Sequence, residues 1–210
     1  MAVLATIRYD AQAAFSWMGY TLAIDCFDGT LARAVGVKQV IPWFDGARLD
    51  DIVDYFTYVI VPVIFLLHME MLPPALALPI ATLVVLASAY GFGNLAAKTS
   101  DHFFTGFPSY WNVLAFYLTL LEWPSWANAL IVTALAVLVF VPFRYVYPSR
   151  TTTLRWLTMS LGIVWMGVTI WLLVVFEDAP RALVVASLAY PVYYFALSAV
   201  LHRRRAASVG

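Results

Sequence analysis

Four aspartates near the start of the chain have spacings that suit metal-assisted chemistry. Asp25 and Asp28 are three residues apart, and Asp50 and Asp54 are four residues apart. Either spacing places both carboxylates of a pair on one face of a helix. Four neighbouring carboxylates repel one another unless cations lie between them. Mg²⁺ and Mn²⁺ prefer oxygen ligands and suit sites that handle phosphate. We therefore predict a divalent metal site here.

A solvated acidic patch at a helix end is the simpler alternative. The dipole at a helix N-terminus stabilises Asp50 and Asp51 there, and Asp51 is rotated by about 100° from Asp50. Asp25 does not fit this alternative, because it lies near the C-terminal end of an apolar helix, where a carboxylate is disfavoured. Ionisable residues within membrane segments are usually functional, so the pattern favours a site.

The residues between the aspartates indicate what the site binds. Gly29 and Gly46 allow a backbone or a ligand to approach closely. Ala32 lies four residues after Asp28 and leaves room on the same face. Arg33 supplies a planar cation that suits phosphate oxygens. Together with the aspartates, these residues predict a site for a diphosphate and metal ions.

The composition indicates which elements position these residues. The chain has 210 residues, of which 63% are hydrophobic and 11% are charged. Soluble domains carry about 25% charged residues, so this chain needs the bilayer as a second apolar solvent. We predict an all-α, polytopic transmembrane helix bundle of about seven helices, forming a single domain over residues 1–210. The predicted helices cover residues 13–32, 52–69, 75–97, 107–121, 126–143, 156–176 and 182–201.

The distribution of charges predicts the orientation. Formal net charge is zero, so charge does not imply a nucleic acid partner, and the single cysteine, Cys26, excludes an internal disulfide. Cations concentrate in alternate loops and in the C-terminal tail, which the positive-inside rule places in the cytoplasm. The aspartates adjoin one of these loops, at residues 33–48. The cations are Arg33, Lys38, Arg48, Lys98, Arg144, Arg150, Arg155, Arg203, Arg204 and Arg205.

The two runs 25–33 and 46–54 carry the motif D-x-x-D-G-x-x-A-R followed by G-x-x-x-D-x-x-x-D. This pattern resembles the signature of the CDP-alcohol phosphatidyltransferases. The spacer between the runs, residues 34–45, is longer than is usual in that family. Segments 37–42, 49–59 and 98–112 look like the bacterial phosphatidylcholine synthases, a subfamily. The similarity covers nearly the whole chain.

The resemblance implies that CDP-diacylglycerol and choline react to give phosphatidylcholine and CMP. Two divalent ions, Mn²⁺ or Mg²⁺, would be held by Asp25, Asp28, Asp50 and Asp54, and Asp54 would also be the catalytic base. It implies a multi-pass protein of the bacterial inner membrane, with its active site and C-terminus in the cytoplasm, and we expect a homodimer. Family members usually have a helix before the one with the first aspartates, so we expect that helix to be missing here. Gly29, Ala32, Arg33 and Gly46 would bind the nucleotide diphosphate.

Choline adds a requirement for aromatic residues. A quaternary ammonium has no N–H to donate, so proteins recognise it through aromatic faces. Tyr55 is the first candidate because it adjoins Asp54. Aromatic residues are also common at membrane interfaces, which is the alternative explanation for each of them. The candidates for acceptor binding are Tyr55, Tyr58, Tyr90, Phe103 and Trp111.

Two alternatives remain at this stage. The same reaction with serine, glycerol phosphate or an inositol compound is the nearer one. A phosphorylated acceptor would need a basic cluster beside the site, and only Arg48, Lys98 and the group at 144–155 are available. The second alternative is a transporter, which would place ionisable groups near mid-membrane on several helices. Here they gather at one surface, which favours an enzyme.

Overall fold

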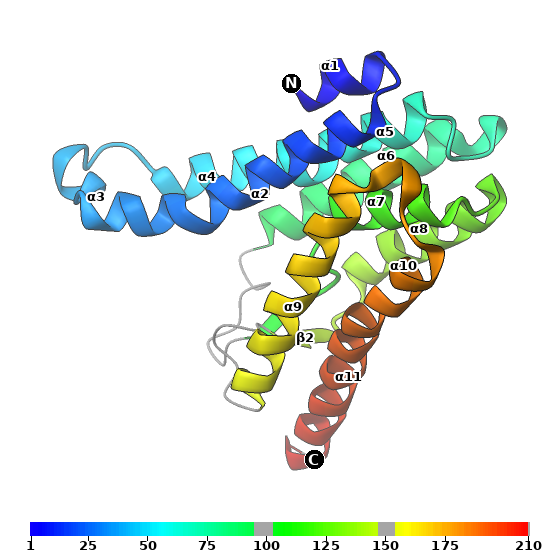
Figure 1. The fold of residues 1–210 in the computed structure, drawn as a ribbon. Helices are drawn as coiled ribbons and strands as arrows, with labels where there is room; N and C mark the ends of the chain where they lie inside the picture. The colour runs from blue at the N-terminus through cyan, green and yellow to red at the C-terminus, as the bar shows by residue number, and fades with distance from the viewer. Residues whose placement is uncertain (95–102, 147–153, 210) are drawn as a thin grey trace.

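The structure is a computed structural model that describes residues 1–94, 103–146 and 154–209, and most of these residues are helical (Figure 1). Each of the seven apolar stretches coincides largely with a helical region, and residues 95–97 of the third stretch lie outside the described residues. The predicted all-α bundle is confirmed. The longer helices are α2 (Ala11–Ala34), α6 (Pro74–Gly93), α7 (Trp111–Leu121), α8 (Ser125–Phe140), α9 (Arg155–Val174) and α11 (Ala189–Val209). The shorter ones are α1 (Ala2–Ile7), α3 (Val37–Val40), α4 (Gly46–Tyr55), α5 (Val61–His68), the 3₁₀ turn η2 (Phe176–Asp178) and α10 (Arg181–Ser187).

Four helical segments in the described residues are long and apolar enough to cross a membrane. They are Gly46–His68, Pro74–Gly93, Arg155–Val174 and Arg181–Arg203. Helices α7 and α8 are apolar but shorter. Helix α2 has 24 residues, but Asp25, Asp28 and Arg33 interrupt its apolar sequence. The chain is thus a polytopic membrane bundle, as predicted.

Helices α2 and α4 form an antiparallel pair that extends beyond the rest of the bundle, with α3 at its far end (Figure 1). Both helices begin at an aspartate cap: the Asp10 side chain accepts from the N–H of Ala13 over 2.8 Å, and that of Asp45 accepts from the N–H of Arg48 over 3.3 Å. Gly36, at φ 66°, allows the left-handed turn between α2 and α3. This pair carries all four motif aspartates.

The segment Gly46–His68 runs as one helix with a wider turn in its middle. A π-helical turn, η1 (Phe56–Ile60), lies between α4 and α5, and the N–H of Val61 donates to the carbonyl of Phe56. Pro62 follows closely. Its ring crowds the carbonyl four residues earlier, that of Tyr58, and it has no N–H to donate to that group. We attribute the wider turn to this proline, since π turns relieve such clashes.

Aromatic packing anchors the first half of α2 in the core. The ring of Phe15 lies 4.6 Å from that of Phe65 in α5 and 5.3 Å from that of Phe116 in α7. Ala14 and Met18 are also buried there. Leu22, four residues after Met18, is already 37% exposed. The core therefore holds α2 in a fixed orientation about its axis, and the buried residues that do so end about one helical turn or more before Asp25.

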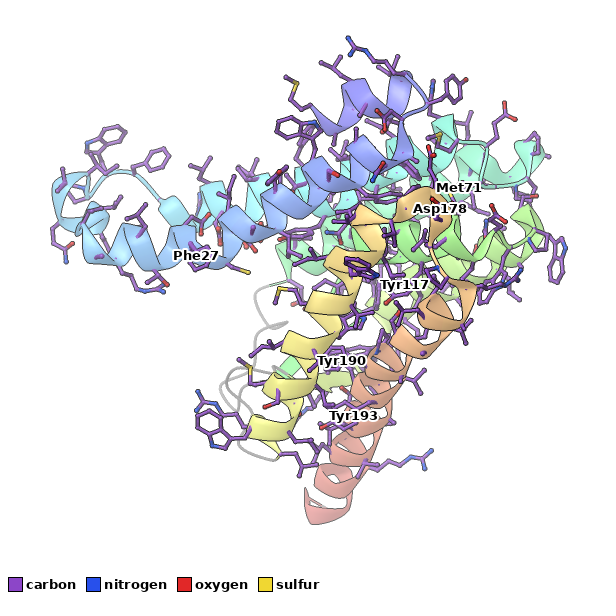
Figure 2. The ribbon with its side chains drawn as sticks, in the orientation of Figure 1. Phe27, Met71, Tyr117, Asp178, Tyr190 and Tyr193 are labelled. Carbon is purple, nitrogen blue, oxygen red and sulfur yellow. The ribbon has the colours of Figure 1, made fainter. Side chains whose placement is uncertain are left out.

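The second half of the chain packs around α7 and α9. The indole N–H of Trp165 donates to the hydroxyl of Tyr117 over 2.9 Å, which joins α9 to α7. Tyr190 and Tyr193 lie between α9 and α11 (Figure 2), where the hydroxyls of Tyr193 and Thr158 are 2.9 Å apart. Most of α9 is nevertheless exposed, as expected for a helix that faces lipid.

A small antiparallel ribbon is the departure from an all-helical chain within the described residues. Strand β1 (Phe103–Thr105) pairs with strand β2 (Arg144–Val146), and Phe104 lies opposite Tyr145. Each strand has only three residues, which is too short for an alternation of polar and apolar residues to predict a strand. The ribbon joins the connection before α7 to the connection after α8.

Candidate active site

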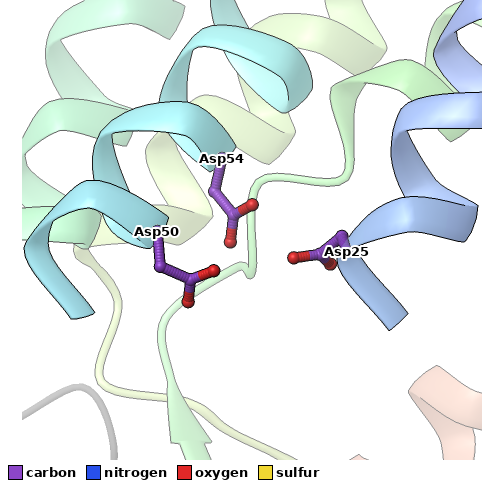
Figure 3. Close-up of side chains that lie close together, drawn as sticks. All are labelled: Asp25, Asp50 and Asp54. Carbon is purple, nitrogen blue, oxygen red and sulfur yellow. The ribbon is translucent and has the colours of Figure 1, made fainter. Parts of the chain in front are cut away.

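Three of the four motif aspartates converge between α2 and α4. Asp25, Asp50 and Asp54 each offer a carboxylate oxygen, and these oxygens all lie within 4.8 Å of one another. Asp50 and Asp54 extend from one face of α4, and Asp25 faces them from α2 (Figure 3). Asp25 and Asp54 are half-buried, whereas Asp50 is exposed. The two helix faces thus meet at these three residues.

Asp28 is not part of this three-residue group. It lies on α2 one turn beyond Asp25, and its side chain is exposed. Neighbouring residues Ile24, Phe27 and Leu31 are each at least 65% exposed, so this part of α2 has little protein around it. Metal binding by Asp28 stays a prediction.

Tyr58 touches the group from the side of the core. Its hydroxyl donates to Oδ2 of Asp25 over 2.9 Å, and its side chain is 9% exposed. The bond joins the π-helical turn η1 to α2. The sequence predicts Tyr58 as an acceptor-binding residue, and that role stays untested. Spacing along the chain does not reveal this contact with the Asp25 carboxylate.

The residues predicted to bind a nucleotide lie on both sides of the α2–α4 connection. The guanidinium of Arg33 folds back along α2: Nη2 donates to the hydroxyl of Thr30 over 3.0 Å, and a Cβ at Gly29 would lie 3.3 Å from Nη1. Ala32 is half-buried. Gly46 begins α4, and a Cβ there would meet nothing within 4 Å. Arg33 and Gly46 are exposed, so a ligand can reach them.

Two of the other acceptor candidates have partners in the core. The hydroxyl of Tyr55 donates to the carbonyl of Val85 in α6 over 2.9 Å. Trp111 is fully buried, and its indole N–H donates to Ser88 over 2.8 Å. Tyr90 is 52% exposed, and its ring lies 5.1 Å from that of Phe140 in α8. The backbone of Phe103 lies in β1, and its side chain is outside the described part of the structure. Acceptor binding by these residues stays a prediction.

The site also contains a π-helical turn, which the spacing of the aspartates in the sequence did not predict. It begins two residues after Asp54 and contains Tyr58. Such turns often occur at functional sites. The available signal was Pro62, because a proline within an apolar helical stretch requires a local change in hydrogen bonding.

The chemistry of the donors fits a hard divalent cation. Three carboxylate oxygens within 4.8 Å of one another supply the negative charge and the oxygen ligands that Mg²⁺ and Mn²⁺ prefer. Without a cation, three carboxylates at this separation repel one another. The group can therefore hold a metal ion, with Asp50 open to solvent and to further ligands.

This chain is similar to several curated proteins named phosphatidylcholine synthase. It is 42% identical over 173 residues to a phosphatidylcholine synthase of Bradyrhizobium diazoefficiens, covering 82% of this chain and 65% of the relative. It is 48% identical over 136 residues to a phosphatidylcholine synthase of Legionella bozemanae, covering 64% and 63%. A phosphatidylcholine synthase of Agrobacterium fabrum is 31% identical over 201 residues, which cover 96% of this chain and 83% of the relative.

The extent of these matches differs between relatives. The chain covers just under two thirds of the Bradyrhizobium and Legionella proteins, at 65% and 63%, and a larger part of the Agrobacterium protein. No family model matches the chain.

Proposed function

The chain belongs to the family of the bacterial phosphatidylcholine synthases, and on that premise we propose that it transfers the phosphatidyl group of CDP-diacylglycerol to choline. The products are phosphatidylcholine and CMP. The observation that carries the proposal is the convergence of Asp25, Asp50 and Asp54 within 4.8 Å, inside a membrane bundle. A pyrophosphate and an alcohol can meet at such a group when a cation neutralises it.

Two divalent ions, Mn²⁺ or Mg²⁺, are the cofactors that we propose. Asp25, Asp50 and Asp54 would hold them, and Asp28 would complete the set from the next turn of α2. When bound, such ions neutralise the diphosphate and stabilise the charge of the departing CMP. Arg33 and Gly46, both exposed near the ends of α2 and α4, would bind the nucleotide part.

Asp54 is the residue that we propose as the base. It would take the proton of the choline hydroxyl while the hydroxyl oxygen forms a bond to the phosphorus that carries diacylglycerol. The bond from this phosphorus to the oxygen of CMP breaks, and CMP leaves. Asp54 is half-buried, which limits its contact with water. Its neighbour Asp50 is exposed and is better placed for a metal ligand than for a base.

The membrane position of the site suits these substrates. The segment Gly46–His68 is long enough to span the bilayer, and Asp50 and Asp54 lie in its first turns. The acyl chains of CDP-diacylglycerol could therefore remain in lipid while its headgroup reaches the carboxylates. We propose the inner membrane, with the site and the C-terminus in the cytoplasm and two chains in a homodimer.

The test is an assay of the full chain in lipid vesicles with CDP-diacylglycerol. We expect CMP release and phosphatidylcholine formation only when choline and Mn²⁺ or Mg²⁺ are present. Serine, glycerol 3-phosphate and inositol serve as competing acceptors, and a faster reaction with one of them would overturn the choice of choline.

Asp54→Asn is the variant that tests the proposed base. It preserves the shape of the side chain and removes the carboxylate. We expect turnover to fall by about 100-fold or more, as for loss of a general base, with the protein still inserted in the membrane. Turnover close to wild type would remove Asp54 from this role.

A further inference from the structure

The hydrogen bond between Tyr58 and Asp25 joins two segments that are distant in the sequence. The donor belongs to η1 and the acceptor to α2, 33 residues earlier in the chain. The same segment that contains Tyr58 also presents Asp50 and Asp54. The Tyr58 hydroxyl thus links the segment that carries Asp50 and Asp54 to Asp25, the member of the group that α2 supplies.

The two ends of this bond differ in how firmly the protein holds them. Tyr58 is 9% exposed, and the next residue, Val59, is fully buried. Asp25 lies in the part of α2 that has left the core: Ile24 is 65% exposed and Phe27 is 71% exposed. Packing therefore fixes the tyrosine ring, whereas Asp25, itself half-buried, lies on a stretch of α2 whose neighbouring large side chains are exposed. The hydroxyl supplies an orienting contact that packing does not.

Accepting this bond does not prevent Asp25 from binding a cation. An ionised carboxylate has two oxygens with about four acceptor positions, and Tyr58 occupies one of them. Groups that hydrogen-bond to metal ligands fix the orientation of those ligands, and their loss typically weakens metal binding by about 10- to 100-fold.

We propose that Tyr58 is a positioning residue: its hydroxyl holds the Asp25 carboxylate in the orientation in which it meets Asp50 and Asp54 around a divalent cation. The inference rests on the proposed function, because it requires that the group binds metal. It assigns Tyr58 to the metal site and not to the acceptor. At 9% exposure, the ring offers little surface to a quaternary ammonium.

The experiment measures Mn²⁺ binding to the full chain in detergent, by calorimetry or by the paramagnetic resonance signal of free Mn²⁺. Tyr58→Phe removes only the hydroxyl. We expect it to weaken Mn²⁺ binding by about 10-fold or more. The matched control is Tyr194→Phe, because Tyr194 is also 9% exposed and its hydroxyl also donates one bond, to the carbonyl of Val146 over 3.0 Å. We expect the control to bind Mn²⁺ like the wild type.

A double-mutant cycle with Asp25→Asn tests whether Tyr58 acts through Asp25. We expect Tyr58→Phe to have no further effect on Mn²⁺ affinity once Asp25 has been changed. Equal effects in both backgrounds, or an unchanged affinity in Tyr58→Phe, would overturn the proposal. Absence of Mn²⁺ binding by the wild type would instead overturn the metal site itself, and this role with it.

Turnover gives a second readout of the same proposal. With Tyr58→Phe, we expect low activity at limiting Mn²⁺ that excess Mn²⁺ restores, and a KM for choline close to that of the wild type. A raised KM for choline at saturating Mn²⁺ would show that Tyr58 serves the acceptor and would contradict the positioning role.

Discussion

Asp25 and Asp28 lie on the same helix, and helical spacing alone treats them as equivalent. The structure separates them. Asp25 is half-buried, accepts a bond from Tyr58 and shares the group with Asp50 and Asp54, whereas Asp28 is exposed and outside that group. A ligand that the fold already orients costs less to organise when a cation binds. The two residues should therefore differ in their effect on metal affinity.

The first prediction compares Asp25→Asn with Asp28→Asn, each of which removes one negative charge at similar volume. We expect Asp25→Asn to weaken Mn²⁺ binding by about 100-fold and Asp28→Asn by less than about 10-fold. Titration of Mn²⁺ into each purified variant measures both effects. Asp51→Asn controls for net charge, because Asp51 is not in the three-residue group. Equal losses at positions 25 and 28 would make Asp28 a full ligand, as the motif predicts.

The second prediction concerns Tyr90, which keeps more than half of its side chain exposed, at 52%. An exposed aromatic face can bind a quaternary ammonium, at about 0.5–2 kcal/mol. We expect Tyr90→Leu to raise the KM for choline by about 2- to 30-fold, with Mn²⁺ affinity unchanged. Tyr20→Leu is the control: Tyr20 is 62% exposed in α2. An unchanged KM in Tyr90→Leu would remove Tyr90 from the acceptor candidates.

At the scale of the elements, Gly106 shows how closely the connection before α7 approaches α8. Its φ is +88°, and a Cβ there would clash with the carbonyl oxygen of Val139. Its N–H donates to the carbonyl of Phe143 over 2.9 Å, next to the β1–β2 ribbon. A side chain at this position would meet backbone, which has little freedom to move.

The third prediction is that Gly106→Ala destabilises the protein by about 1–2 kcal/mol or more, because it combines left-handed strain with a clash. Thermal unfolding in detergent measures the effect. Gly167→Ala is the matched control, since Gly167 lies within α9 and a Cβ there meets nothing within 4 Å. Alanine favours a helix over glycine, so the control should be neutral or stabilising. Equal stability of both variants would contradict this account of Gly106.

The elements that could be predicted from the sequence are those that depend on local pattern. Apolar stretches near membrane length must form helices to satisfy their backbone groups, and each of the seven is largely helical over its described residues. The i, i+4 spacing correctly placed Asp50 and Asp54 on one face of α4. The sequence could not predict that Asp25 and not Asp28 would face them. That choice depends on the rotation of α2, which Phe15 fixes through contacts with Phe65 and Phe116.

Contacts between residues that are distant in the sequence could not be predicted either. Nothing local to Tyr58 indicates that its hydroxyl meets Asp25, because the contact depends on the π turn and on the pairing of α2 with η1. The pairing of β1 with β2 also depends on residues that are distant in the sequence. The two strands are separated by α7 and α8, and they pair only because those helices return the chain to the same end of the bundle.

At the scale of the whole molecule, the helices define two sets of connections that must lie on opposite sides of the bilayer. Lys38 lies in the connection between α2 and α4, and Arg33 and Arg48 flank it at the adjoining helix ends, whereas the connection before α8 carries Glu122. The positive-inside rule assigns the first to the cytoplasm and the second to the opposite side. An exposed tryptophan suitable for labelling lies in the first connection, Trp43 at 82% exposure, and another lies beside the second, Trp126 in the first turn of α8 at 67% exposure.

The fourth prediction uses these two positions in a Cys26→Ala background, which has no other cysteine. A maleimide that cannot cross membranes should label Trp43→Cys in inside-out vesicles and Trp126→Cys in intact spheroplasts. The two variants control for the reactivity of the introduced thiols, because we expect each thiol to be labelled from one side of the membrane only. Labelling of Trp43→Cys from outside would invert the topology and place Asp50 and Asp54 at the outer surface. The proposed reaction would then lack access to cytoplasmic CDP-diacylglycerol headgroups, so this measurement tests the orientation on which the site depends.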